Sequence, residues 1–166
     1  GTSLSISTAG TSDAGSYDVV VTNSCGSTIS NPAIVAVNPL PTVNVPANYS
    51  ICPGTLTSGT SFSSNPAGAT YTWTNSNTSI GLASGGTGDI PAFTALNPGT
   101  TTISSTITVT PTLNGCTGPS SSFIITVKPA PSALVPASFS VCSGTIISSS
   151  NFSSLPLGAS YTWTNS

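Results

Sequence analysis

YTWTNS, at residues 71–76, occurs a second time without any change at residues 161–166. The offset is 90 residues (161 − 71), and at this offset the whole stretch 39–76 aligns with 129–166 without a gap and with more than half of its positions identical. Internal repetition of this kind indicates a protein built from copies of one structural unit. We therefore predict a complete repeat over residues 39–128, the N-terminal part of a next repeat over 129–166, and the C-terminal part of a preceding domain over 1–38.

The residue types within the complete repeat favour an all-β fold. Val and Ile supply much of the apolar content, and Gly, Pro, Asn and Ser separate the apolar runs, as in strands joined by turns. Ile103, Ile107 and Val109 alternate with small polar residues, which is typical of a strand with one buried face. The expected strands lie near residues 42–45, 55–62, 70–74, 90–95, 101–110 and 121–127, with a hairpin turn at Asn114-Gly115. Their number and spacing predict an antiparallel β-sandwich.

Two short linkers flank the complete repeat. They are residues 38–41 and 128–131, and each carries two alternating prolines. Such segments favour an extended polyproline conformation and act as semi-rigid spacers. The sequence therefore predicts tandem domains arranged as an elongated rod.

Charged side chains are scarce, and this limits the partners that the chain can bind. They make up 2% of the sequence and give a net charge of −2 from Asp13, Asp18, Asp89 and Lys128. Nucleic-acid binding requires several cationic side chains, so we expect no nucleic-acid partner. No run of 18 apolar residues and no charged leader followed by an apolar run occurs, so we expect neither a membrane span nor a signal peptide in this stretch, and any export signal or anchor to lie outside it.

The composition also argues against catalysis. The chain has no His and no Glu and a single Lys, which leaves almost no general acid or base. We therefore predict that it is not an enzyme and holds no cofactor and no metal. Asp89 follows the Gly-rich stretch 85–88, but it lacks the further carboxylates of a calcium site and the Lys of a phosphate loop, so we expect it to solvate a turn. Asp13 is expected to make a local turn contact.

The four cysteines lie in two repeat-equivalent contexts. Cys52 and Cys142 each open the pattern Cys-x-Gly-Thr, and Cys25 and Cys116 each lie in the last hairpin of a unit. The simplest pairing is one bond per domain, Cys52 with Cys116, with the partners of Cys25 and Cys142 outside this stretch. In a head-to-tail array of copies, Cys142 would instead face Cys25 of the neighbour. A metal site or free buried thiols are the alternatives.

A disulfide of this kind would close a loop of about 65 residues and would be worth roughly 4 kcal/mol on the chain-entropy model. It would also require an oxidising compartment. We therefore predict an extracellular or cell-surface location.

Two stretches resemble known families. Asp13-Ala-Gly15-Ser-Tyr17 resembles the Ig-fold signature, in which the Tyr hydroxyl bonds nearby backbone as a tyrosine corner. Over 39–128, Cys52-Pro-Gly-Thr, Tyr71-Thr-Trp73-Thr-Asn and Asn114-Gly-Cys116 are similar to the PKD-like and Ig-like repeats of giant adhesins of Bacteroidota, which the type IX secretion system exports and some of which serve gliding motility. The resemblance implies a structural role for Tyr17 and a core position for Trp73 and its copy, Trp163.

Together, these features predict a structural stalk or filament segment of a secreted adhesin. Its partners would be neighbouring repeats or head-to-tail copies, with a surface polysaccharide or other surface ligand left open. One alternative is a carbohydrate-binding accessory module of a large secreted enzyme, which would need exposed aromatic side chains. Tyr71 and Trp73 share one face of a predicted strand, where we expect core packing. The other alternative is a self-assembling filament subunit.

Overall fold

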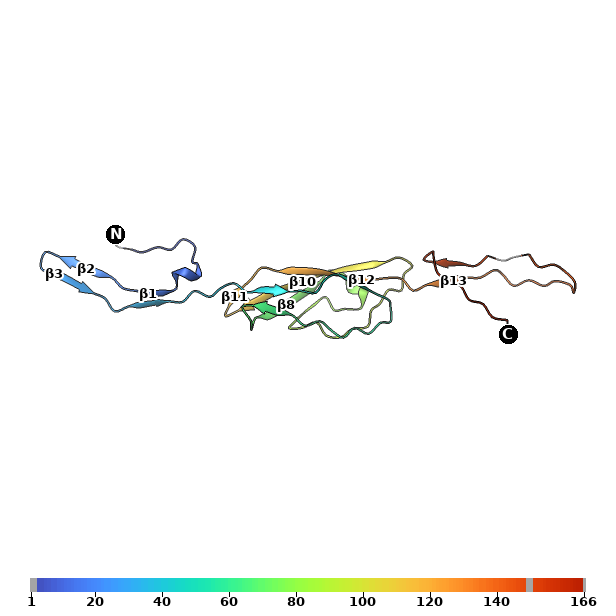
Figure 1. Ribbon diagram of the computed structural model, residues 1–166, viewed down its shortest axis with the longest axis horizontal. Helices are drawn as coiled ribbons and strands as arrows, with labels where there is room; N and C mark the ends of the chain where they lie inside the picture. Colours follow the sequence, from blue (N-terminus) through green and yellow to red (C-terminus); the bar gives the residue numbers. More distant parts are fainter. Residues whose placement is uncertain (1–2, 149–150, 166) are drawn as a thin grey trace.

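The computed structural model describes residues 3–148 and 151–165 of the 166-residue chain, and its regular secondary structure consists almost entirely of short β-strands joined by loops (Figure 1). Within those residues, the helical elements are two 3-10 turns, η1 (Thr11–Asp13) and η2 (Thr78–Ile80). This confirms the predicted all-β class.

The strands fall into three groups along the chain. The first group is β1 (Gly15–Tyr17), β2 (Val20–Asn23), β3 (Gly26–Ile29) and β4 (Ala33–Val35). The second is β5 (Thr42–Asn44), β6 (Tyr49–Ile51), β7 (Ser63–Asn65), β8 (Thr70–Asn75), β9 (Gly85–Thr87), β10 (Ile103–Leu113), β11 (Cys116–Thr117) and β12 (Ser121–Val127). The third is β13 (Ser132–Leu134) and β14 (Ser153–Leu155).

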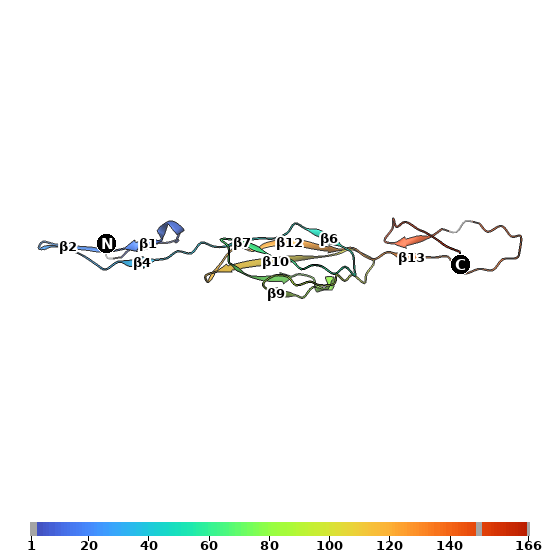
Figure 2. The same ribbon diagram turned by 60° about the horizontal axis from the view of Figure 1, so that its bottom comes forward.

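The second group forms the central unit, whose main sheet has the strand order β6-β12-β10-β8-β9, with β11 paired to the end of β10. Its longest strand, β10, pairs antiparallel with β8 on one side and β12 on the other, and β6 adds to β12 in parallel. β5 and β7 form a separate two-stranded sheet. Figure 2 shows β6 and β9 toward opposite edges of the unit, with β12 and β10 between them.

The buried core lies within the central unit. Alternate residues of β10 and β12 point inward, as the period of two predicts for Ile107 and Val109, and Phe123 and Ile125 join them from β12. Residues from outside the sheet close the cluster, among them Val43 of β5, Ile80 of η2 and Phe93. The main sheet therefore buries its apolar face against β5, η2 and the loops, and this burial holds this part of the chain together.

The prediction of regular strands over 55–62 and 90–95 is wrong. These two segments run side by side through single bridges, Leu56 with Thr94 and Thr60 with Ile90, and through scattered backbone hydrogen bonds. Gly59 lies between the two bridges with φ +82°, and a Cβ there would come within 2.8 Å of the Ile90 carbonyl oxygen. This left-handed residue interrupts the extended conformation that a continuous ladder needs.

The third group of strands reproduces the start of the central unit. Thr42 pairs with Asn65 in the β5–β7 sheet, and Ser132 pairs with Leu155 in the β13–β14 sheet, so both partners shift by the same 90 residues. The Ser64 hydroxyl donates to the Pro66 carbonyl at 2.8 Å, and its counterpart Ser154 donates to Pro156 at 2.9 Å. The sequence repeat therefore specifies the same local structure twice.

Candidate functional site: the two poles of the central unit

The chain enters and leaves the central unit at opposite ends of β10 (Figure 1). At the entry pole, Pro41 lies against Gly118, where a Cβ would collide with the Pro41 carbonyl. Gly118 in turn donates its N–H to the Pro111 carbonyl at 2.9 Å, near the hairpin that joins β10 to β11. At the exit pole, the Lys128 N–H donates to the Ile51 carbonyl at 3.0 Å, beyond the last pair of β6 and β12.

The entry pole carries a tight turn that the sequence predicts. Asn114 and Gly115 have φ of 51° and 79°, as a two-residue turn with both central residues left-handed requires. Leu113 and Cys116 face each other on either side of the turn. The Asn-Gly prediction is confirmed.

The cysteines are not bonded as predicted. All four carry free thiols, and Cys52 and Cys116 lie at opposite poles. Cys52 follows β6 at the exit pole, whereas Cys116 begins β11 at the entry pole. The 11 residues of β10 separate the two ends, roughly 30 Å at the usual rise per residue. A disulfide needs Cα atoms within about 7 Å, so the intradomain bond is excluded by the topology of the sheet.

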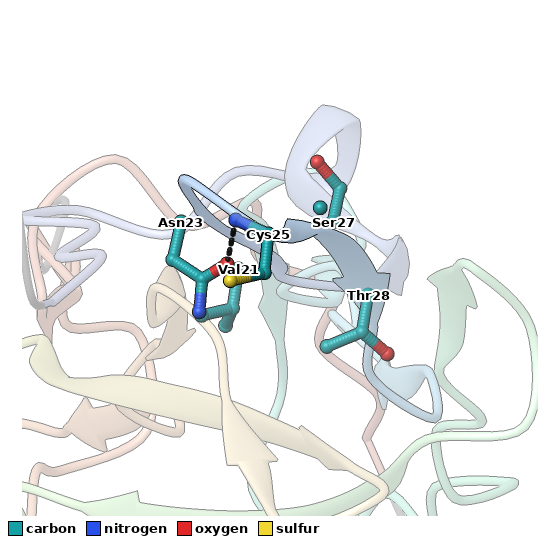
Figure 3. A pocket seen from close by; sticks show the side chains of 6 residues that line it. Val21, Asn23, Cys25, Ser27 and Thr28 are labelled. Atoms are coloured by element: carbon teal, nitrogen blue, oxygen red, sulfur yellow. Dashed lines mark hydrogen bonds between the residues drawn. The ribbon is translucent and has the colours of Figure 1, made fainter.

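Cys25 and Cys142 are exposed thiols. Cys25 lies in the turn between β2 and β3, where its N–H donates to Asn23 Oδ1 at 2.8 Å (Figure 3). The hollow beside it, about 330 Å³, is lined by side chains of that hairpin alone. Because Cys25 is placed like Cys116 and Cys142 like Cys52, the two would lie at opposite poles of any unit that they completed together. The predicted contact of Cys142 with Cys25 of a neighbouring copy does not fit this topology.

The two tryptophans differ in their surroundings. Trp73 is buried with 3% of its surface exposed and belongs to the core cluster, whereas Trp163 is 77% exposed. Trp73 lies in β8 between β9 and β10, while Trp163 has no paired strand beside it. The core position expected for Trp163 is therefore wrong for this chain, because burial of the indole requires the strands that follow β8.

Tyr17 and Asp13 make the local contacts expected of them, whereas Asp89 makes a contact with a distant segment of the chain. Tyr17 is half-buried, and its hydroxyl donates to the Asp13 carbonyl oxygen at 2.8 Å, the backbone tie of a tyrosine corner. The Asp13 carboxylate accepts the Gly10 N–H at 2.8 Å. Asp89 Oδ1 accepts the Phe62 N–H at 3.1 Å and so joins the Gly-rich loop to the segment before β7.

Two buried asparagines were not singled out from the sequence. The Asn75 amide donates to the Leu82 and Ala83 carbonyls at 2.8 and 3.0 Å, and the Asn97 amide donates to Thr101 and Val127 at 2.8 and 2.9 Å. They fix long loops to the sheet where regular backbone pairing is missing. In a sequence, an Asn in an apolar or loop stretch indicates a turn. The role of Asn75 and Asn97 in anchoring loops can therefore be identified only from the course of those loops in the structure.

A shallow groove lies beside Tyr71 on the surface of the central unit. Residues of β8 and of the loop after β9 line about 600 Å³ of space, including Tyr71, Gly88 and Asp89. The Tyr71 ring packs against Phe62 with ring centroids 5.6 Å apart. One aromatic edge and one carboxylate therefore border this groove.

Among residues 3–148 and 151–165, no three His, Cys, Asp or Glu side chains gather in a way that could hold a metal ion. The same residues contain no helix long and apolar enough to cross a membrane. No protein-family model and no curated protein sequence matches the chain.

Proposed function

We propose that this chain is a stalk or filament segment of a secreted cell-surface adhesin, in which Ig-like β-sandwich units follow one another as an elongated rod. One observation carries the proposal: the chain enters the central unit at one pole and leaves it at the other. Units of this kind add length with every copy. A unit whose ends lay side by side would fold the array back on itself.

The position of the last strand supports a mechanical role. β12 runs to the exit pole between β10 and β6, and it is paired with β10 over seven residues and with β6 over three. Tension applied along the rod would pull β12 along its own axis and load these hydrogen bonds together, so that they would have to break as a group. Strands arranged in this way resist extension.

The shortage of charge fits a spacer rather than a recognition surface. With one Lys and three Asp in 166 residues, the chain has little capacity for charge-directed binding. We propose that ligand recognition belongs to another part of the protein, at the cell surface or in the extracellular space.

Concatemers of residues 39–128 test the stalk proposal. Electron microscopy of chains with two, four and six copies should show threads whose length grows in proportion to the copy number. Compact particles whose longest dimension stays nearly constant would overturn it. A concatemer in which the prolines of the linkers are replaced by Gly is the matched control, and it should give threads of the same contour length but greater curvature.

The groove beside Tyr71 supports a second candidate, a carbohydrate-binding module. Burial of Trp73 removes the strongest sugar-stacking side chain, so binding would depend on Tyr71. Titration with soluble polysaccharides should then show binding that Tyr71→Ala abolishes and Tyr71→Phe keeps. No binding by the unaltered chain to any polysaccharide would leave the stalk as the better proposal.

A further inference from the structure

We propose that the cysteines link neighbouring repeats, so that Cys52 bonds the hairpin cysteine of the repeat that follows it. Cys116, on the same pattern, bonds the Cys-x-Gly-Thr cysteine of the repeat before it. The inference rests on the proposed end-to-end arrangement of the units. It differs from the intradomain pairing, which the positions of the two cysteines exclude.

Each pole of the central unit presents one thiol next to the point where a neighbour joins. Cys52 is exposed and comes directly after Ile51, whose carbonyl accepts the Lys128 N–H at the start of the outgoing linker. Cys116 is partly exposed and lies two residues before Gly118, which packs on Pro41 at the end of the incoming linker. A junction between two such units therefore receives one cysteine from each side.

The linker is short enough for these thiols to meet. Three steps from Lys128 to Pro131, the counterpart of Pro41, span about 9 Å in polyproline conformation. In the central unit, Gly118 lies level with Pro41, and Cys116 lies two extended residues, about 7 Å, beyond it toward the incoming linker. In the following repeat, the counterpart of Cys116 would therefore lie about 7 Å from the level of Pro131, on the side of Lys128. About 2 Å then remains along the axis, so the linker brings the two cysteines to nearly the same level, as a disulfide with its Cα atoms roughly 4.4 to 6.8 Å apart requires.

The repeat provides this arrangement at each junction. Cys142 lies 90 residues after Cys52 in the same Cys-x-Gly-Thr context (142 − 52), and Cys25 lies in a hairpin before the linker at residue 38, as Cys116 lies in a hairpin before the linker at 128. The central unit thus carries one cysteine at each pole, and Cys25 and Cys142 continue the same pattern on either side of it. A bond at each junction would join the units into a covalently braced array.

The chemistry is a two-electron oxidation. The thiols of Cys52 and the hairpin cysteine lose two protons and two electrons as one sulfur–sulfur bond forms. A small-molecule disulfide accepts them and is released as two thiols, through a mixed-disulfide intermediate. Both thiols need access to this oxidant, and the exposure of Cys52 and partial exposure of Cys116 provide it.

The test extends the full chain, residues 1–166, with a second copy of residues 77–128. By the 90-residue match this copy completes the third repeat and supplies its hairpin cysteine. After equilibration with oxidised and reduced glutathione, mass spectrometry of the unreduced digest should find the added hairpin cysteine bonded to Cys52. Bonding of the added cysteine to Cys142, within its own repeat, would overturn the proposal, and so would free thiols at both positions.

Two single variants provide the matched controls. Cys52→Ser should abolish the bridge, whereas Cys142→Ser should leave it intact, and both replace exposed thiols that have no packing role in the core. Thermal unfolding of both variants, measured under reducing conditions, verifies that the fold is retained. The stalk proposal is judged separately by electron microscopy of the reduced chain, since the rod does not depend on the bridge for its existence.

Discussion

The packing of the Trp73 indole depends on Gly86, a neighbour that has no side chain. A Cβ on Gly86 would come within 2.6 Å of Cζ2 and 2.9 Å of Cε2 of the indole, so the backbone of β9 lies flat against the ring. The indole Nε1 is buried and has no hydrogen-bond partner among the described residues. The ring is therefore held by shape alone, and its pocket tolerates little change.

Gly86→Ala should destabilise the central unit by about 1–3 kcal/mol, because the added methyl group must push the indole or β9 aside. Chemical denaturation followed by Trp fluorescence measures the loss. Gly15→Ala is the control, since no atom lies within 4 Å of the position that its Cβ would take. Equal stability of Gly86→Ala and the unaltered chain would show that the contact is absent.

Tyr49 connects stability to alkaline pH. Burial raises its pKa above the ordinary value of 10.0, and the Thr60 side chain offsets part of the rise. The neutral form is thus favoured in the folded state, so its contribution is complete below pH 10.0 and is lost as the pH rises through the raised pKa. The free energy of unfolding should fall across that range, and the free energy of unfolding of the Tyr49→Phe variant should fall less steeply. Tyr161→Phe, which removes an exposed tyrosine, should keep the full decline.

Residue roles could be predicted where they follow from local spacing. The period of two in β8 and β10 predicts the inward positions of Trp73, Ile107 and Val109, and the Asp-x-Gly-x-Tyr pattern predicts the Tyr17 contact. The roles of Gly86 and Asn97 could not be recognised from local spacing. Gly86 acts on Trp73 of the neighbouring strand, and the Asn97 amide bonds the Val127 carbonyl, which is 30 residues away.

At the scale of elements, the regular strands are those whose partners run straight beside them. β10 and β12 continue in register over seven pairs, and their alternating pattern predicts them well. β9 could not be predicted, since Gly85 and Gly86 disfavour strands in isolation, and its pairing follows from the packing on Trp73. The segments 55–62 and 90–95 show the reverse, because strand-like residue types meet a glycine with positive φ that breaks the ladder.

The hairpin at the entry pole gives a prediction at this scale. Gly115→Ala should cost about 1–2 kcal/mol, because an L residue is strained at a φ of 79°. Asn114→Gly should be close to neutral, since its φ of 51° is accessible to glycine without strain. Thermal unfolding of the two variants side by side measures the difference, and a neutral Gly115→Ala would contradict the assigned turn.

At the scale of the molecule, the core cluster lies wholly between Val43 and Val127. In contrast, many apolar side chains of the first and third groups of strands are exposed, among them Val20, Ile34, Leu134 and Leu155. Stability should therefore reside in the central unit. The sequence repeat could not place the cysteines, because the parallel pairing of β6 with β12 decides which pole Cys52 occupies.

Residues 39–128 alone should unfold cooperatively at a melting temperature within a few degrees of the full chain. The buried groups are the same in both, so the same free energy is lost on unfolding. Calorimetry of the two chains makes the comparison. Failure of the shorter chain to fold would place essential contacts outside the central unit.

The separation of Cys52 from Cys116 tests the central claim, that the unit has two opposite poles. Spin labels on these two residues, in a full chain carrying Cys25→Ser and Cys142→Ser, allow the distance between the labels to be measured by pulsed electron–electron double resonance. The account predicts a single distribution at roughly 30 Å, the length of β10. A distance near 10 Å, or ready formation of a Cys52–Cys116 bond on mild oxidation, would contradict it.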